Sequence, residues 1–96
     1  MSAYLIGKME IRDHEAYARY KAVTPDIIKR HGGRFLTRGG SKITLEGREE
    51  TRRIVIVEFD SPQAAEAFYR SRDYQQAIKL REGAAIMDLM IVGGFE

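Results

Sequence analysis

Two charged residues lie inside apolar stretches of the chain, where they could act on a small molecule: Lys8 in AYLIGKMEI and Glu58 in RRIVIVEF. A partly desolvated carboxylate can act as a general base, and a nearby ammonium group can pair with it. Asp88, in the last apolar stretch, can add to the same surface. The structural alternative is an ion pair between Lys8 and Glu58 that sets the register of a sheet or a dimer, because buried charges need partners whether or not they catalyse.

His31, Arg34 and Arg38 form a second candidate site. A histidine titrates near neutral pH, and two arginines an even number of residues apart on a strand share one face, where they could hold a carboxylate or an enolate. The alternative is again structural. The helix dipole favours a histidine in the last turn of a helix, and arginines on an outer strand protect its edge.

Composition excludes several other kinds of chemistry. The chain has no cysteine, which rules out disulfides, thiolate nucleophiles and cysteine metal sites and fits a cytoplasmic location. His14 and His31 lack the spacing of a metal site, and we expect neither a metal nor a cofactor. No apolar run approaches the roughly 20 residues of a membrane span, and we expect no secretory signal. The net charge of +2 is small for an obligate nucleic-acid binder.

The segment 52–69 predicts a central strand followed directly by a helix. Residues 54–59 are β-branched or aromatic on both faces except at Glu58, which is typical of a strand that is covered on both sides. Ser61 can cap the following helix, and Pro62 can occupy its first position. Apolar residues lie on one side of this helix: Ala64, Ala65, Phe68 and Tyr69.

The N-terminal half begins with the alternating pattern of a strand over Ala3–Ile11. A helix follows over about 14–31, which Asp13 can cap and which Pro25 either kinks or restarts. Its expected apolar stripe consists of Ala16, Tyr20, Val23 and Ile27. We expect the tyrosines of the helices to fill the space between helices and sheet, where one phenol at the rim could donate to a ligand.

Two further strand patterns complete the sheet. One runs over 34–38, bends at Gly39, continues over 43–45 and turns back into the central strand as a hairpin. The other runs over 85–92, after a further short helix. The element order is therefore β-α-β-β-α-β. This order predicts a single α+β domain over residues 1–96 with a ferredoxin-like fold, an antiparallel sheet of strand order 4-1-3-2 and both helices on one face.

One face of this sheet has no helix to cover it. Val55, Val57 and Phe59 can meet the helices, which leaves an apolar open face that includes Tyr4, Ile6, Ile54 and Ile56. An apolar face of several hundred Å² is seldom left to water in a monomer. We therefore expect a homodimer that pairs the open faces of two copies into an α/β barrel.

An RNA-binding domain is the main alternative use of this open face. RRIVIVEFDSPQAAEAF is similar to the third strand and second helix of an RNA-recognition motif, in which two inner aromatic residues stack on bases. Here those positions hold Ile54 and Ile56, and Tyr4 offers one stacking surface instead of three. We therefore do not expect nucleic acid as a partner, and we keep Tyr4 as a candidate contact for a small ligand.

Three sequence runs are jointly specific for one known family: GGRFLTRGG, EFDSPQAAEAFY and SRDY. Through them, and over nearly its whole length, the chain resembles the small bacterial family called domain of unknown function 1330. The resemblance implies a ferredoxin-like subunit that dimerises face to face into an α/β barrel. It also implies kinship with cofactor-free oxygenases, cyclases and muconolactone-type isomerases, which work in the cleft between sheet and helices. The family has no agreed activity, so the resemblance assigns no catalytic residue.

Two functional hypotheses follow, and the sequence does not decide whether the protein is an enzyme. In the first, it is a cofactor-free enzyme or a binder of a small anionic or aromatic molecule. The candidate catalytic residues are Glu58 and His31, and the candidate ligand-binding residues are Tyr4, Lys8, Arg34, Arg38 and Asp88. In the second, it is a structural or regulatory dimer, and its charged residues only set the register.

Overall fold

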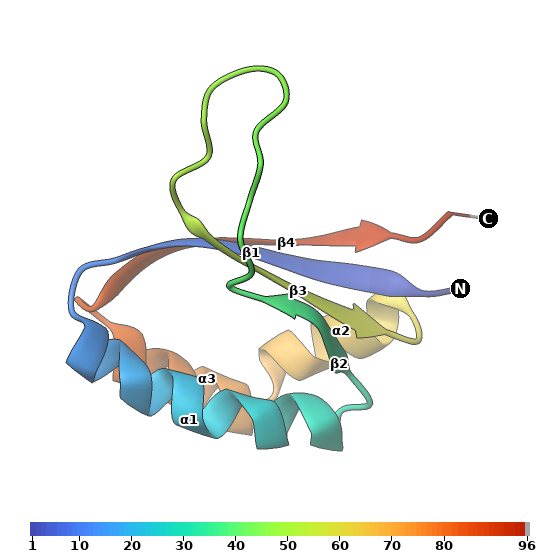
Figure 1. Cartoon of the computed structure of the whole chain (residues 1–96). Coiled ribbons are helices and arrows are strands. Elements are labelled where there is room, and N and C mark those ends of the chain that lie inside the picture. The colour runs from blue at the N-terminus through green and yellow to red at the C-terminus, as the bar shows by residue number, and fades with distance from the viewer. Residues whose placement is uncertain (96) are drawn as a thin grey trace.

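The computed structural model describes residues 1–95 and forms two layers, a sheet and a layer of helices (Figure 1). Its elements are β1 (Ala3–Ile11), α1 (His14–Arg30), β2 (Arg34–Arg38), β3 (Arg53–Phe59), α2 (Pro62–Arg70), α3 (Arg72–Ile78), a 3-10 turn (Lys79–Arg81) and β4 (Ala85–Gly93). The strands are antiparallel in the order β2-β3-β1-β4, which confirms the predicted topology. The helices lie on one face of the sheet, as predicted (Figure 1).

Helix α1 is not interrupted by its proline. Asp13 caps it by accepting a hydrogen bond from the backbone N–H of Ala16, and the helix continues without a break through Pro25 to Arg30. The side chains that it buries against the sheet are Tyr17, Tyr20, Thr24, Ile27 and Ile28. The predicted stripe was therefore partly wrong: Val23 is exposed, because the buried face is turned by one residue toward Tyr17 and Thr24.

Two serines organise the second half of the helical layer. Ser61 accepts a hydrogen bond from the N–H of Ala64, and Pro62 occupies the first turn of α2, as predicted. Ser71 ends α2 and begins α3: its hydroxyl donates to the carbonyl of Phe68 and accepts from the N–H of Tyr74. One side chain thus satisfies backbone groups at two helix ends, which allows a sharp turn between the helices.

The core lies between the helices and the sheet. Its largest fully buried side chains are Val57 and Phe59 from β3, Phe68 from α2 and Tyr74 from α3. The ring centroids of Phe68 and Tyr74 are 4.5 Å apart, which is typical of a packed aromatic pair. These contacts confirm that Val57 and Phe59 face the helices.

Residues 39–52, which we call the β2–β3 arm, do not form the predicted second part of a strand. The arm leaves the sheet on the side away from the helices (Figure 1), and Ile43 and Leu45 are 86% and 88% exposed. Gly39 adopts φ +73° and makes the last ladder bond to the carbonyl of Ile54, after which the chain turns away from β3. A left-handed residue at this point directs the following residues away from their neighbouring strand.

The open face carries apolar side chains along its three longer strands. They are Tyr4 and Ile6 on β1, Ile54 and Ile56 on β3, and Ile86, Met90 and Val92 on β4. Those on β1 and β3 are half-buried, whereas Ile86 and Met90 are 51% and 50% exposed.

No helix within residues 1–95 is long and apolar enough to cross a membrane.

Candidate functional site

The predicted ion pair between Lys8 and Glu58 does not form. Lys8 lies opposite Ile54, whereas Glu58 lies opposite Tyr4. The two charges are therefore four positions apart along the strands, about 13 Å at the usual strand rise. Glu58 instead accepts a hydrogen bond from Arg34 at the edge of the open face.

Lys8 belongs to a separate charge network at the other end of the open face. Its ammonium lies 3.5 Å from Glu50, and Arg52 binds both Glu50, at 2.9 Å, and Asp88, at 2.8 Å. The hydrogen bond from Arg52 lowers the pKa of Glu50 to about 2. Each charge in this network has a partner of opposite sign, so the arrangement favours the structural interpretation of Lys8 and Asp88.

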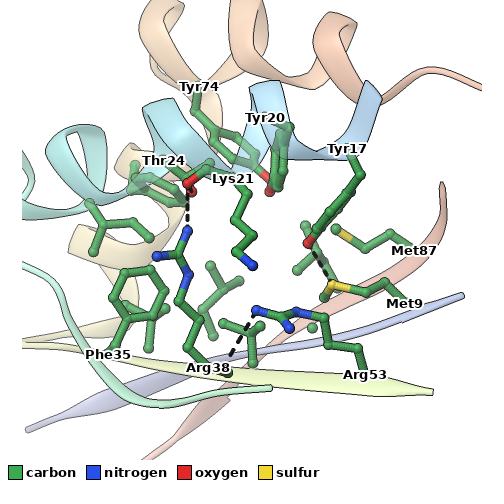
Figure 2. Close-up of a pocket in the computed structure, with 17 residues that line it drawn as sticks. Met9, Tyr17, Tyr20, Lys21, Thr24, Phe35, Arg38, Arg53, Tyr74 and Met87 are labelled. Atoms are coloured by element: carbon green, nitrogen blue, oxygen red, sulfur yellow. Dashed lines mark hydrogen bonds between the residues drawn. The ribbon is translucent and has the colours of Figure 1, made fainter. Parts of the chain in front are cut away.

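Arg34 and Arg38 lie on opposite faces of the sheet, contrary to the prediction. The register of β2 against β3 shifts between Phe35 and Thr37, which leaves Leu36 as the extra residue of a β-bulge. A bulge reverses the alternation of the side chains that follow it. Arg34 therefore stays on the open face beside Glu58, while Arg38 points between the sheet and α1 (Figure 2).

His31 also lies away from the other predicted site residues. It is the C-cap of α1, where its backbone N–H donates to the carbonyls of Ile27 and Ile28. Its ring packs edge to face with that of Phe68, with the two ring centroids 5.9 Å apart. It does not line the space that Arg38 enters. These contacts fit the structural interpretation of His31 as a residue of a helix terminus.

A cavity lies between α1 and the sheet and brings together a different set of residues (Figure 2). Its volume is about 40 Å³, enough for a few water molecules. Apolar side chains form most of its wall, and its polar lining consists of Tyr17, Tyr20, Lys21, Thr24, Arg38, Arg53 and Tyr74. Of the residues predicted for a site, only Arg38 belongs to this lining.

The sequence did contain signals for two of the missed residues. Arg53 has the same strand parity as Val55, Val57 and Phe59, which places it on the helix-facing side of β3. Lys21 is four residues after Tyr17 on α1, so both lie on the same face of the helix. Lys21 itself is exposed, whereas a charged residue at a core position of a strand, such as Arg53, is unusual enough to indicate a site.

The phenols of the cavity differ in their hydrogen bonding. Tyr20 and Tyr74 bond to each other, with their hydroxyl oxygens 2.7 Å apart, and burial raises the pKa of Tyr20. Tyr17 donates to the sulfur of Met9 at 2.8 Å, and sulfur is a weak acceptor. Burial raises the pKa of Tyr17, and the nearby charge of Arg53 opposes that rise. The Tyr17 hydroxyl is thus protonated at neutral pH and can donate to a ligand.

Pro25 explains how Arg38 reaches across the mouth of the cavity. In a regular helix, the carbonyl of Lys21 would accept from the N–H of residue 25, but proline has none. The guanidinium of Arg38 donates to this free carbonyl, and the hydroxyl of Thr24 approaches it at 3.5 Å. Arg38 also lies over the ring of Phe35 at 4.8 Å. A side chain from β2 therefore bridges to α1 at an acceptor that the proline leaves unpaired.

The described residues include no group of three His, Cys, Asp or Glu side chains that could hold a metal ion.

The sequence profile of the family described as Domain of unknown function (DUF1330) matches residues 2–95. No curated protein matches the chain in sequence.

Several solved structures have a similar fold. A protein of unknown function from Rhodopseudomonas palustris is 23% identical with a TM-score of 0.77, over 99% of this chain and 83% of its own. SnoaB, a cofactor-independent oxygenase from Streptomyces nogalater, is 8% identical with a TM-score of 0.70, over 99% and 94%. A dimeric ferredoxin-like protein of unknown function from Jannaschia sp. CCS1 is 13% identical with a TM-score of 0.69, over 98% and 100%. At these identities, the similarity establishes the ferredoxin-like fold.

Proposed function

We propose that this protein, which belongs to the DUF1330 family, is a homodimer that binds and acts on a small organic molecule in the cavity of each subunit. One observation carries the proposal: a cavity in the interior of a small α+β domain is lined by three buried phenols and by three cationic side chains. A core that served stability alone would not place two arginines and a lysine against it.

A homodimer is supported by the apolar side chains of the open face. Its apolar side chains run over β1, β3 and β4, and Ile86 and Met90 are half exposed in the single subunit. Such a surface is costly to leave in water, and the same face of a second copy covers it most economically. The ferredoxin-like protein from Jannaschia, which has a similar fold, is described as dimeric, and this supports a dimer here.

The chemistry that the cavity supports needs no cofactor. The Tyr17 hydroxyl is a buried donor, and the charge of Arg53 lies close enough to oppose the rise in its pKa. A phenol and a guanidinium that face the same space can stabilise negative charge on an oxygen, as in an enolate or a phenolate. The name of SnoaB, a cofactor-independent oxygenase of similar fold, agrees with a reaction that uses side chains alone.

A structural dimer without a ligand is the second candidate, and the paired charges of the open face favour it. Two variants separate the candidates. Glu58→Gln removes a charge of the open face, so we expect a weaker dimer in sedimentation and unchanged binding in the cavity. Tyr17→Phe removes a donor of the cavity, so we expect the dimer to persist while ligand affinity or turnover falls. If Tyr17→Phe and wild type bind and react identically, Tyr17 has no functional role.

Filling the cavity provides a test that does not depend on a known substrate. Gly7 lines the cavity, and a Cβ added there lies 3.0 and 3.3 Å from the flexible ends of Leu89 and Met9 and 3.9 Å, an ordinary contact distance, from the backbone oxygen of Val55. Gly7→Val is therefore expected to fold and to occupy part of the space. In a screen of small aromatic compounds by thermal shift, hits of the wild type should lose their effect on Gly7→Val. Hits that stabilise both proteins equally would place the binding site elsewhere.

A further inference from the structure

Lys21, Arg38 and Arg53, which we call the cation cluster, enter the cavity from different elements and form no ion pair with a carboxylate within residues 1–95. Lys21 comes from α1, Arg38 from β2 and Arg53 from β3, and Figure 2 shows their side chains pointing into one space. The lining of the cavity contains no Asp or Glu. Within residues 1–95, the ion pairs of the protein involve other lysines and arginines, and none involves the cation cluster.

Arg53 is held in place without being fully satisfied. Its Nε is buried and has no hydrogen-bond partner, and its terminal nitrogen reaches the carbonyl of Arg38 only at 3.5 Å. Gly39 makes room for it: a Cβ at Gly39 would lie 2.2 Å from a terminal nitrogen of the guanidinium. A buried donor that is positioned but unpaired has hydrogen-bonding capacity left for a ligand.

Arg38 has a bond that a ligand could replace. In the free protein, it donates to the carbonyl of Lys21 that Pro25 leaves unpaired. The cavity of about 40 Å³ is smaller than an aromatic ring, so a ligand of that size must displace side chains at the mouth. A carboxylate offers Arg38 a charged acceptor in exchange for a neutral carbonyl, and charge-assisted hydrogen bonds are the stronger kind.

We propose that the cation cluster is an anion subsite and that the molecule bound in the cavity is an aromatic carboxylate. This inference rests on the proposed function of the cavity. The carboxylate lies at the mouth between Arg38 and Arg53, with Lys21 adding charge. The ring points inward against the apolar wall, where Tyr17 can donate to a substituent. The apolar wall favours a single carboxylate with a flat apolar body over a phosphate ester, whose larger charge would need more donors.

Methionine methyl groups provide the readout. Met9 and Met87 line the cavity, whereas Met90 lies on the open face and is 50% exposed. In protein labelled with ¹³C at the methionine methyls, benzoate is expected to shift the Met9 and Met87 resonances in a saturable way and to leave Met90 unchanged. Benzyl alcohol, which keeps the ring and lacks the charge, should bind at least tenfold more weakly.

Two matched variants test the role of Arg53. Gly39 and Gly47 both have positive φ, at +73° and +85°, but only Gly39 touches Arg53. Gly39→Ala should abolish the preference for benzoate by displacing the guanidinium, and Gly47→Ala should retain it. Arg53→Met should reduce the affinity for benzoate to that for benzyl alcohol, while benzyl alcohol still shifts Met9 and Met87.

The outcomes separate this inference from the proposed function. If benzyl alcohol binds to the wild type as tightly as benzoate, the anion subsite is wrong and the small-molecule cavity stands. If Arg53→Met keeps the full preference for benzoate, the subsite is likewise wrong. If neither compound shifts Met9 or Met87, the cavity does not bind aromatic molecules, and the inference of an aromatic carboxylate is wrong.

Discussion

Replacing Arg53 with methionine should make the free protein more stable. The Nε of Arg53 is buried without a partner, and the hydrogen bond from its terminal nitrogen to the carbonyl of Arg38 is long at 3.5 Å. An unsatisfied buried donor costs about 1–3 kcal/mol. Methionine keeps a flexible apolar stem and removes both the unpaired donor and the repulsion from Lys21 and Arg38.

The expected gain is at the lower end of that range, because the side chain is only half-buried. We expect the free energy of unfolding to rise by about 1 kcal/mol in Arg53→Met, measured by urea denaturation at pH 7 and at a fixed protein concentration. Arg70→Met is the control. Arg70 is exposed and pairs with Glu66 one helical turn away, so its loss should change the free energy by less than about 0.5 kcal/mol.

A fall in stability of about 1 kcal/mol or more in Arg53→Met would refute this reasoning, because it would show that the guanidinium contributes to the fold. A gain in stability together with a loss of benzoate binding would identify Arg53 as a residue retained for its ligand at a cost to the free protein.

Three further predictions concern the core, the charge network and the dimer. Tyr20→Phe removes the buried hydrogen bond to Tyr74 and should lower the free energy of unfolding by about 1–2 kcal/mol. Because burial raises the pKa of Tyr20, the stability of the wild type should also fall as the pH rises above 10. This fall in stability should be smaller in the variant. The pKa of Glu50 is lowered from 4.5 to about 2, so its contribution to the free energy of unfolding is complete above about pH 4.5 and is lost as the pH falls toward 2. Denaturation curves of Glu50→Gln should therefore show a smaller loss of stability over that pH range than those of the wild type. An equal loss of stability would contradict this prediction. The double variant Ile43→Ser with Leu45→Ser should weaken the proposed dimer in sedimentation, because these exposed arm residues lie on the side of the open face. An unchanged dissociation constant would exclude the arm from the interface of that dimer.

The topology was predictable because local signals agreed with one another. Strand parity placed Val57 and Phe59 toward the helices, and Ser61 with Pro62 marked the start of α2. These features depend on neighbouring residues, so periodicity and capping patterns reveal them. The fold could therefore be read from the sequence down to the strand order.

The site was not predictable in the same way, because it depends on register. The bulge at Leu36 moves Arg38 to the helix-facing side, and no residue pattern in RFLTR marks it. The pairing of Lys8 with Glu50, in place of Glu58, depends on a four-residue offset between strands and on the path of the β2–β3 arm. In the sequence, Pro25 suggests a kink or a break in α1, whereas its effect in the structure is to leave the carbonyl of Lys21 free for Arg38. Each of these depends on contacts between distant segments.

Intermolecular nuclear Overhauser effects will show where a ligand lies. With benzoate bound to methyl-labelled protein, we predict effects from the ring protons to the methyls of Met9 and Met87, and none to the methyl of Met90. Effects to Met90 alone would place the ligand on the open face and contradict a binding site between α1 and the sheet.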